Sequence, residues 1–241
     1  MTVKISPEEL LEAGAHYGHQ ARRWNPKMAP YLYGIENGVH VFDLIKTKEA
    51  LEKALDFLTE SVKAGKVVLL LGAKKQTQEI IAQIGKETGL PYISERWLGG
   101  TLTNFEQIRK SIKRLSEMKE KMASGEYNKY TKKERLLLDR EIERLKKLFG
   151  GLSTLEKMPD VLFVVDTHRE TAAIKEALKA KITTVGIVDS NSDPSIIDYP
   201  IPMNDDASKA LELVLNWVKE ALLEGKKGIK KTTEKEKKNE D

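Results

Sequence analysis

The sequence predicts an α/β protein with a doubly wound, flavodoxin-like or Rossmann-like parallel sheet and an inserted antiparallel α-helical coiled-coil hairpin. Two all-apolar runs, VVLLL at 67–71 and VLFVV at 161–165, are typical of parallel strands that are buried on both faces. Helical periodicity alternates with such runs along most of the chain. A long charged stretch of helical spacing interrupts this alternation at 104–150, which indicates an insertion.

The first half of the α/β pattern lies before the insertion. VHVFDL at 39–44 is strand-like, and the helix that follows it, at about 48–63, should end at Gly65. After the first apolar strand we expect a helix at 75–88 and a short strand at 91–93. We expect the strand at 39–44 to open the series of βα units.

The second half repeats this alternation after the insertion. The second apolar strand is followed by a helix at 170–180 and a strand at 183–188. A short strand near 199–201 and a helix at 206–224, ended by Gly225, complete the series. Repeated βα units of this size predict a parallel sheet with helices on both faces.

The insertion has the pattern of two antiparallel helices. Apolar residues recur at 4-3 spacing in both of its halves: Ile108, Ile112, Leu115, Met118 and Met122, then Leu138, Ile142, Leu145 and Phe149. A break at Gly125 should fold the second helix back on the first, and arms of about 20 residues would each be roughly 30 Å long. The apolar stripes are narrow and the other faces are dense in Arg and Lys, which favours a projecting hairpin over two ordinary core helices.

The composition excludes several classes of protein. Of 241 residues 40% are apolar and 32% charged, and the absence of cysteine excludes disulfides and thiolate zinc sites. The N-terminal segment lacks the apolar core of a signal peptide, and the apolar runs are too short to span a bilayer. We therefore expect a soluble cytoplasmic protein with no membrane partner.

The net charge of +4 is unevenly distributed along the chain. Residues 15–35 carry three cations and no acid, and residues 105–149 carry 14 Lys and Arg against 8 Asp and Glu. Residues 150–224 instead carry 7 cations against 13 acids, whereas residues 225–241 carry 7 against 4. This segregation predicts a polyanionic partner that is bound by selected basic surfaces.

Motifs of nucleotide-dependent enzymes are incomplete in this sequence. LLLGAKKQT at 69–77 lies at a strand-to-helix turn but lacks the second glycine and the GK[ST] ending of a Walker loop. We interpret it as a βα turn with two exposed lysines. Asp166, His168, Asp189 and Asp193 follow neighbouring strands at their carboxyl ends, where doubly wound folds bind ligands.

Local structure accounts for these polar residues without catalysis. Thr167 and Glu170 are spaced as a capping box for the helix that follows, and SNSDPS at 190–195 consists of turn formers. Asp205 and Asp206 suit the N-terminus of the last helix by capping and by the helix dipole. We therefore expect no catalytic residue, no small-molecule substrate and no cofactor.

Two histidines, His16 and His19, are the candidates for a metal site. Their three-residue spacing could bring both imidazoles to a divalent cation together with an Asp from the strand ends. Because there is no cysteine and no third ligand nearby in the sequence, we favour a packed or hydrogen-bonded pair under the sheet edge. We accordingly assign no metal.

The segment AHYGHQARRWNPKMAPYLYG, at 15–34, has the composition of an anion-binding surface. Arg22 and Arg23 offer guanidinium groups to phosphates, and Trp24 offers a flat ring for stacking. Its two prolines should hold the segment in an extended form. We predict that it contacts nucleic acid.

Four blocks of the sequence closely resemble the S-two family of small ribosomal subunit proteins, in its bacterial form. These blocks are GAHYGHQARRWNPKMAPYLYG (14–34), NGVHVFDL (37–44), RWLGGTLTNF (96–105) and IVDSNSDPSIIDYPIPMNDDA (187–207). The resemblance runs in order from about residue 5 to residue 224. Two positions depart from it: Met203 stands where glycine is expected and Ser190 where threonine is common.

The resemblance implies a structural protein of the ribosome with no catalytic activity. It implies a doubly wound domain with a protruding coiled coil, at the head–body junction of the small subunit. The implied partners are 16S ribosomal RNA and neighbouring small-subunit proteins. Among these is the large OB-fold-repeat protein that captures messenger RNA, which the family helps to dock.

We expect the RNA-binding residues among the cations of the arm, of the segment before the insertion, and of the insertion. The candidates are Arg22, Arg23, Trp24, Lys27, Arg96, Arg109, Lys110, Lys113, Arg114, Lys132, Lys133 and Arg135. A solvated helix face would have the same composition as the hairpin, so we expect only some of its cations to touch RNA. Gly99 and Gly100 more simply allow a tight turn into the hairpin.

The chain is expected to divide into an α/β domain, a hairpin and a tail. Residues 1–103, which include the basic arm at 15–35, and residues 151–225 would form the α/β domain around the hairpin at 104–150. Residues 226–241 would form a basic disordered tail.

Two alternatives differ in function class from the ribosomal one. A nucleotide-binding α/β enzyme would need a phosphate loop, which the sequence does not contain. A non-ribosomal coiled-coil scaffold would need apolar residues on both faces of the hairpin, whereas only one face of each arm has them.

Overall fold

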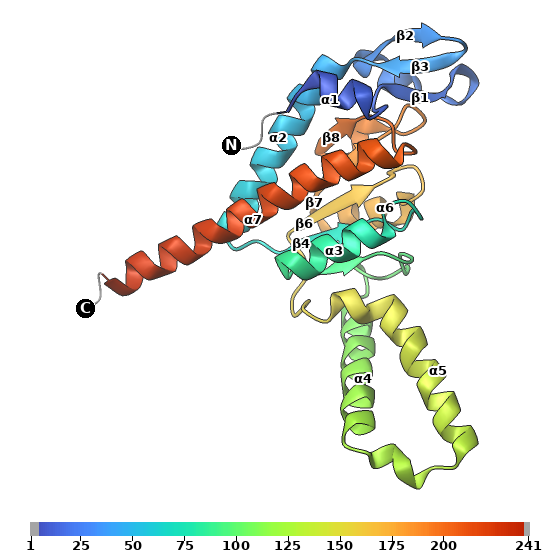
Figure 1. Ribbon diagram of the computed structural model, residues 1–241, viewed down its shortest axis with the longest axis vertical. Coiled ribbons are helices and arrows are strands. Elements are labelled where there is room, and N and C mark those ends of the chain that lie inside the picture. Colours follow the sequence, from blue (N-terminus) through green and yellow to red (C-terminus); the bar gives the residue numbers. More distant parts are fainter. Residues whose placement is uncertain (1–4, 239–241) are drawn as a thin grey trace.

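The computed structural model describes residues 5–238 of the chain, and the side chains as far as residue 228 (Figure 1). Its centre is a five-stranded parallel sheet in the order β5-β4-β6-β7-β8. The strands are β4 (Val68–Leu71), β5 (Tyr92–Ile93), β6 (Val161–Val165), β7 (Thr183–Val188) and β8 (Tyr199–Pro202). The predicted parallel sheet is confirmed, with every predicted strand except the one at 39–44.

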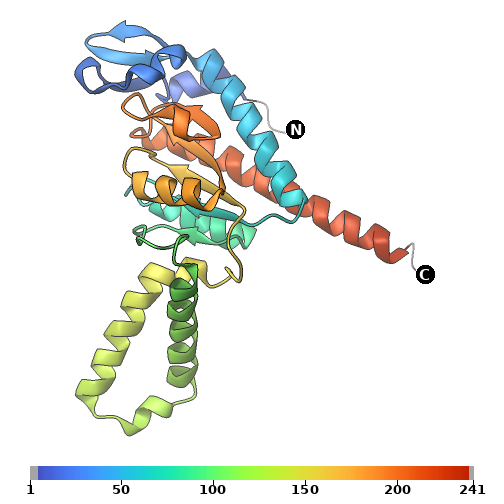
Figure 2. The same cartoon turned by 180° about the vertical axis from the view of Figure 1, so that it is seen from behind.

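Helices cover both faces of this sheet (Figures 1 and 2). Because successive side chains of a strand point to opposite faces, Val68 and Leu70 lie in one apolar cluster and Leu69 and Leu71 in another. The helices on the first face are α2 (Leu44–Lys63), α3 (Gln78–Thr88) and α7 (Ser208–Lys238). The second face carries α6 (Thr171–Ala180) and the near part of the insertion. This arrangement is consistent with a doubly wound α/β fold.

The β8 edge of the sheet is closed by prolines. The backbone N–H of Met203 donates to Val188 O at 3.1 Å, so odd-numbered residues of β8 direct their N–H groups toward β7. The outward positions are Pro200 and Pro202, which have no N–H to offer another strand. Thr47 Oγ1 donates to the outward Pro202 carbonyl at 2.7 Å. Met203 itself does not have a positive φ, so its backbone does not require the glycine of the family pattern.

The strand predicted at 39–44 belongs to a separate antiparallel sheet, in the order β1-β3-β2. Its strands are β1 (Tyr17–Gln20), β2 (Leu32–Glu36) and β3 (Val39–Phe42). Asn37 and Gly38 both have positive φ, 51° and 76°, as a two-residue hairpin turn requires. The expectation that this strand opens the βα series was therefore wrong, because a hairpin turn joins it to its neighbour. Phe42 anchors the small sheet on Val188 and Ile174 of the main domain.

One helix start and one predicted helix cap differ from those expected. Helix α2 begins at Leu44 because the Asp43 carboxylate accepts the N–H groups of Ile45 and Lys46 as an N-cap. Helix α6 begins after Glu170 with no side-chain cap, so the predicted Thr167–Glu170 capping box is not formed. The Thr167 hydroxyl is instead buried without a hydrogen-bond partner among the described residues.

Helix α7 passes straight through the position predicted to end it. Gly225 is buried where α7 crosses α2, and a Cβ there would lie 2.7 Å from Thr59 O and 2.8 Å from Val62 Cβ. The glycine therefore permits a close helix crossing rather than a helix end. The backbone of the predicted tail at 226–241 is helical as far as Lys238; its last three residues, and the side chains from 229 on, lie outside the described residues.

The insertion consists of two helices joined by a short turn. They are α4 (Phe105–Ala123) and α5 (Lys132–Phe149), with the 3-10 turn η3 (Glu126–Lys129) between them. Arg114 Nη2 lies 3.6 Å from Glu141 Oε1 across the pair. Toward the turn the two helices diverge (Figures 1 and 2), and Met122, Leu136 and Leu137 are about half exposed there. The two predicted helices are present, but they pack side by side only in the part nearer the body.

Short elements complete the fold. They are α1 (Pro7–Glu12) and the 3-10 turns η1 (Ala21–Arg23), η2 (Pro26–Tyr31), η4 (Gly150–Leu152) and η5 (Pro194–Ile196). Within the described part of the chain, no helix combines the length and the apolar character needed to cross a bilayer.

The close crossing at Gly225 generates a stability prediction. In an exposed helix interior, alanine stabilises a helix by about 1 kcal/mol relative to glycine. At Gly225, however, the Cβ of an alanine would overlap the backbone of α2. We expect Gly225→Ala to lower the free energy of unfolding by about 1–3 kcal/mol in urea denaturation. Gly99→Ala is the matched control, because no atom lies within 4 Å of that Cβ position. Equal stability of the two variants would contradict the close crossing.

Candidate nucleic-acid interface

The basic arm is folded onto the carboxyl-terminal ends of the strands of the parallel sheet, at the loop that follows β7. The N–H of His19 donates to Ser190 Oγ at 2.7 Å, and the N–H of Asn25 donates to Ser190 O at 2.7 Å. Both prolines of the arm lie in the 3-10 turn η2. The expected extended form was therefore wrong, because backbone hydrogen bonds to the loop after β7 hold the arm in compact turns.

Arg22 and Arg23 are exposed, as an anion-binding role requires. Arg22 Nε donates to Gln20 Oε1 at 3.0 Å, which leaves its terminal nitrogens toward solvent. Neither arginine has an ion-pair partner within the described part of the chain. The uncompensated charge at this end of the small sheet is thus concentrated on two neighbouring guanidinium groups.

The other two predicted arm residues are partly occupied inside the protein. Trp24 stacks on His40, with ring centroids 4.6 Å apart and an interplanar angle of 28°, so only its other face is open to a base. Burial of His40 lowers the pKa of its imidazole. Lys27 Nζ contacts Asp193 Oδ2 at 2.6 Å and Ser195 Oγ at 2.9 Å. Lys27 therefore ties the arm to η5 as well as offering charge.

The loop that leads into the hairpin is fixed by one carboxylate, that of Glu176 on α6. Glu176 Oε1 accepts from Trp97 Nε1 at 3.1 Å and from the Gly100 N–H at 2.8 Å. Glu176 Oε2 accepts from the Leu102 N–H at 3.0 Å and from both the N–H and the hydroxyl of Thr103 at 3.1 Å. Burial alone raises the pKa of Glu176, but these hydrogen bonds together hold it below its usual value. Sequence reasoning missed this residue, because a glutamate within an amphipathic helix looks solvated.

The same loop contains Gly99, Gly100 and the predicted RNA-binding residue Arg96. Gly100 has φ +91°, so the predicted backbone freedom is used there, whereas Gly99 does not need it. Arg96 is exposed beside Trp97, which is buried. The tryptophan of this block is therefore a core residue and the arginine is available at the surface.

The predicted hairpin cations divide into open and engaged groups. Arg109, Lys110, Lys132 and Lys133 are exposed, with no ion-pair partner among the described side chains. Lys113 lies 3.8 Å from Glu117 on its own helix, and Arg114 faces Glu141 of α5. Arg135 is half-buried, and its Nε has no hydrogen-bond partner in the described structure.

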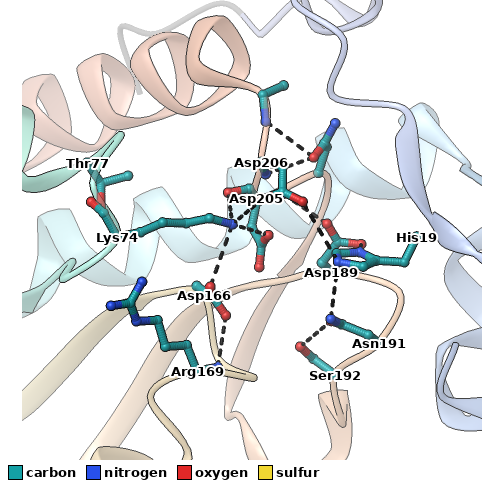
Figure 3. Close-up of polar contacts among 12 residues, drawn as sticks. His19, Lys74, Thr77, Asp166, Arg169, Asp189, Asn191, Ser192, Asp205 and Asp206 are labelled. Carbon is teal, nitrogen blue, oxygen red and sulfur yellow. Dashed lines mark hydrogen bonds and ion pairs between the residues drawn. The ribbon is translucent and has the colours of Figure 1, made fainter. Parts of the chain in front are cut away.

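A second polar cluster occupies the ligand position of the doubly wound sheet (Figure 3). Lys74, in the turn after β4, reaches Asp205 Oδ1 at 2.7 Å, Asp206 Oδ1 at 2.6 Å and Asp166 Oδ2 at 3.6 Å. Asp166 has a positive φ of 65°, which is costly for a residue with a side chain. Of the two lysines of this turn that were predicted to be exposed, Lys75 is exposed. The prediction was wrong for Lys74, whose side chain is only 11% exposed.

The pKa values of Asp205 and Lys74 in this cluster are both raised, for different physical reasons. Burial raises the pKa of Asp205, and the charges of Asp189 and Asp166 raise it further, to about 7. Burial lowers the pKa of Lys74, but its contacts with Asp205 and Asp206 outweigh this and raise it to about 12. Asp205 and Asp206 thus bind a lysine rather than cap α7.

The two histidines of the arm do not form a pair. His19 Nδ1 lies 2.9 Å from Asp189 Oδ1, and this hydrogen bond raises the pKa of His19. His16 instead packs against the Tyr17 ring, with centroids 3.9 Å apart. No group of three metal-ligating side chains occurs within the described part of the chain. The prediction of hydrogen bonding is confirmed for His19, whereas the pairing of the two histidines was wrong.

The acidic second half of the chain keeps much of its charge internal. Asp166, Glu170, Asp189 and Asp205 are buried, and Glu176 is bound by the hairpin loop. These carboxylates satisfy groups of the protein itself, so the local excess of acid in the sequence overstates the acidity of the surface.

Comparison with known proteins adds independent information. Residues 10–225 match the family model described as ribosomal protein S2. The chain is 49% identical over 221 residues to small ribosomal subunit protein uS2 of Roseiflexus sp. (strain RS-1), covering 92% of this chain and 84% of that relative. It is 46% identical over 224 residues to the protein of the same name from Coprothermobacter proteolyticus, covering 93% and 84%. The relative of that name from Lawsonia intracellularis is 44% identical over 231 residues, covering 96% and 79%.

The Glu176 carboxylate generates a second stability prediction. Glu176→Gln would turn an acceptor into a donor that faces backbone N–H groups, so we expect a loss of about 1.5–3 kcal/mol in the free energy of unfolding at pH 7. Since the fold lowers the pKa of this carboxyl, the advantage of the parent protein should shrink as pH falls below about 4.3, the pKa of a Glu in an unfolded chain. Glu212→Gln, on the exposed side of α7, should stay within about 0.5 kcal/mol of the parent. A loss no larger than that control would contradict the assigned role.

The pKa of Asp205 generates a pH prediction. An Asp in an unfolded chain has a pKa of about 3.9, whereas in the fold the pKa of Asp205 is raised to about 7. The folded protein therefore holds this proton more tightly, and its stabilising effect is complete below about pH 4 and lost as pH rises through 7. Melting temperatures measured between pH 5 and pH 8 should fall less for Asp205→Asn than for the parent protein. The Asp206→Asn variant, at an exposed position, should retain the parent profile; identical profiles for all three proteins would refute the prediction.

Proposed function

Because this chain belongs to the ribosomal protein S2 family, we propose that it binds 16S ribosomal RNA and helps dock the large OB-fold-repeat protein of the small subunit. It is a structural component of the small ribosomal subunit, and so acts in the cytoplasm on the ribosome; it is not an enzyme. The single observation that carries this function is the family match across residues 10–225, which includes the arm, the hairpin and the sheet. The RNA contacts are the finer part of the proposal and are argued from charge and exposure.

The arm is the first proposed RNA contact. Arg22 and Arg23 stand exposed and without carboxylate partners in the described structure, and the open face of Trp24 lies beside them in the chain. Guanidinium groups bind phosphate oxygens in a bidentate way, and an aromatic ring accepts a base by stacking. Lys27 contributes less free charge, since Asp193 already neutralises it.

The hairpin at 104–150 is the second proposed contact, and we propose it as a separate coiled-coil unit inserted between the two parts of the α/β domain, 1–103 and 151–225. Apolar residues at 4-3 spacing on both helices and the cross-helix contact between Arg114 and Glu141 support this division. Its unpaired exposed cations, Arg109, Lys110, Lys132 and Lys133, are the residues that we propose for RNA, together with Arg96 at its base.

Docking of a protein neighbour has a different kind of support. Near the hairpin turn Leu136 is 50% exposed and Leu137 54% exposed, on a helix that is otherwise rich in charge. Exposed leucines of this kind are typical of protein contacts rather than of phosphate contacts. We propose the turn end of the hairpin for protein neighbours and the basic helix faces for RNA.

The arm provides the experiment that tests the function. In a lysate the parent protein should sediment with small subunits. The double variant Arg22→Glu, Arg23→Glu should fold with an unchanged melting temperature, because both side chains are exposed, but its affinity for small subunits should fall at least about tenfold. Its log–log salt slope should also be shallower, by about 0.7–0.9 for each lost phosphate contact.

The matched control reverses Lys66 and Lys181, which are exposed at the opposite, amino edge of the sheet. This control should sediment like the parent protein. Normal incorporation of the arginine variant would remove the RNA role of the arm, and a parent protein that does not travel with small subunits would refute the function as a whole.

A further inference from the structure

A charged cleft lies where the hairpin joins the body. It has a volume of about 310 Å³ and is lined by side chains from α3, β5, α4 and α5, with the backbone of Gly150 and Gly151 at one end. Four lysines line it: Lys86 of α3, Lys119 of α4, and Lys146 and Lys147 of α5. None of these belongs to the cations that the sequence pattern assigned to RNA.

Three of the four lysines of this cleft have no ion-pair partner among the described residues. Lys146 lies 3.5 Å from Glu143, so that pair cancels. Lys86, Lys119 and Lys147 make no ion pair with any described residue, and Glu95 is the other carboxylate among the lining side chains. The cleft therefore carries an excess of two positive charges, and its unpaired lysines come from three different helices.

This convergence is not explained by packing. All three unpaired lysines are exposed, so they bury no surface that would hold them together. Like charges brought to one concave surface repel one another, and such a site raises the local concentration of anions. An ammonium group on a long stem suits phosphate as a point charge that adjusts its position.

The residues that line the cleft also favour nucleic acid over a protein as its partner. None of the exposed large apolar side chains of the described structure lines this cleft, and Tyr92 is only partly exposed there. Protein interfaces depend on buried aromatic or aliphatic anchors, which this cleft does not offer. Phosphate groups of a nucleic-acid backbone match its charge and its polar character.

We propose that this cleft binds the sugar–phosphate backbone of RNA through Lys86, Lys119 and Lys147. The inference rests on the proposed function in that the RNA is the small-subunit ribosomal RNA. Because the three lysines belong to both the body and the two hairpin helices, a bound backbone ties these parts together. The RNA contact thus fixes the angle at which the hairpin leaves the sheet, as well as adding affinity.

The test uses the full chain and small subunits that have been depleted of it. The triple variant Lys86→Gln, Lys119→Gln, Lys147→Gln keeps helix-compatible side chains and should melt like the parent protein. Its affinity for the depleted subunits should fall at least about tenfold at about 0.1 M salt, and the log–log salt slope should become shallower by about two. The control neutralises Lys66, Lys179 and Lys181, exposed lysines at the amino edge of the sheet, and should bind within about twofold of the parent.

Lysine acetylation followed by mass spectrometry provides a second readout. In the bound parent protein Lys86, Lys119 and Lys147 should be protected, and digestion of the RNA with ribonuclease should restore their reactivity. Protection that survives complete digestion would assign the cleft to a protein and overturn the proposal. If the parent protein and the triple variant bind the subunits equally well, the RNA-binding role of the cleft is overturned and the proposed function stands. If the parent protein does not bind, the ribosomal function itself is refuted.

Discussion

A parallel sheet that is apolar on both faces must be covered on both, and the rest of this molecule follows from how that is done. Three helices cover the first face, whereas the second face has α6 and the near part of the hairpin. Leu115 and Ile142 of the hairpin therefore share a core with Leu69 and Leu162 of the sheet. Through this shared apolar cluster the direction of the insertion is coupled to the packing of the sheet.

Polar contacts then fix what the apolar contacts leave adjustable. Hydrophobic burial has no directional preference, so it could be satisfied by several angles between the hairpin and the body. The Glu176 carboxylate accepts hydrogen bonds from donors in the segment 97–103, and these bonds select one path for the connecting loop. Lys74 acts similarly at the other polar centre, where it joins the turn after β4 to the start of α7. At that centre the position at which doubly wound enzymes bind substrate is filled by the protein's own ammonium group, which agrees with a structural rather than a catalytic role.

The distribution of cations separates internal structure from external binding. Lys27 and Lys74 are held by aspartates of the main domain, so their charges are used within the fold. Arg22 and Arg23 of the arm, and lysines around the hairpin base, remain without such partners in the described structure. A cation that is paired with an aspartate of the fold has its charge compensated, so the exposed cations that stay unpaired mark the surfaces left for an anion. Net charge per segment could not make this distinction, because it counts the two kinds of lysine alike.

The sequence alone determined the parallel strands, the two helices of the insertion and the family, because burial on both faces, 4-3 spacing and the four motif blocks are local patterns. It could not place the strand at 39–44, because strand-like composition does not say which sheet a strand joins. Gly225 was misassigned for a related reason: a glycine that ends a helix and one that permits a helix crossing look the same until α2 is in place. Only the tertiary structure brought Lys74 to Asp205 and Glu176 to the hairpin loop, since each pair is separated by more than 70 residues. Long-range polar contacts have no periodicity along the chain, and so they are decided by the fold that the apolar pattern builds.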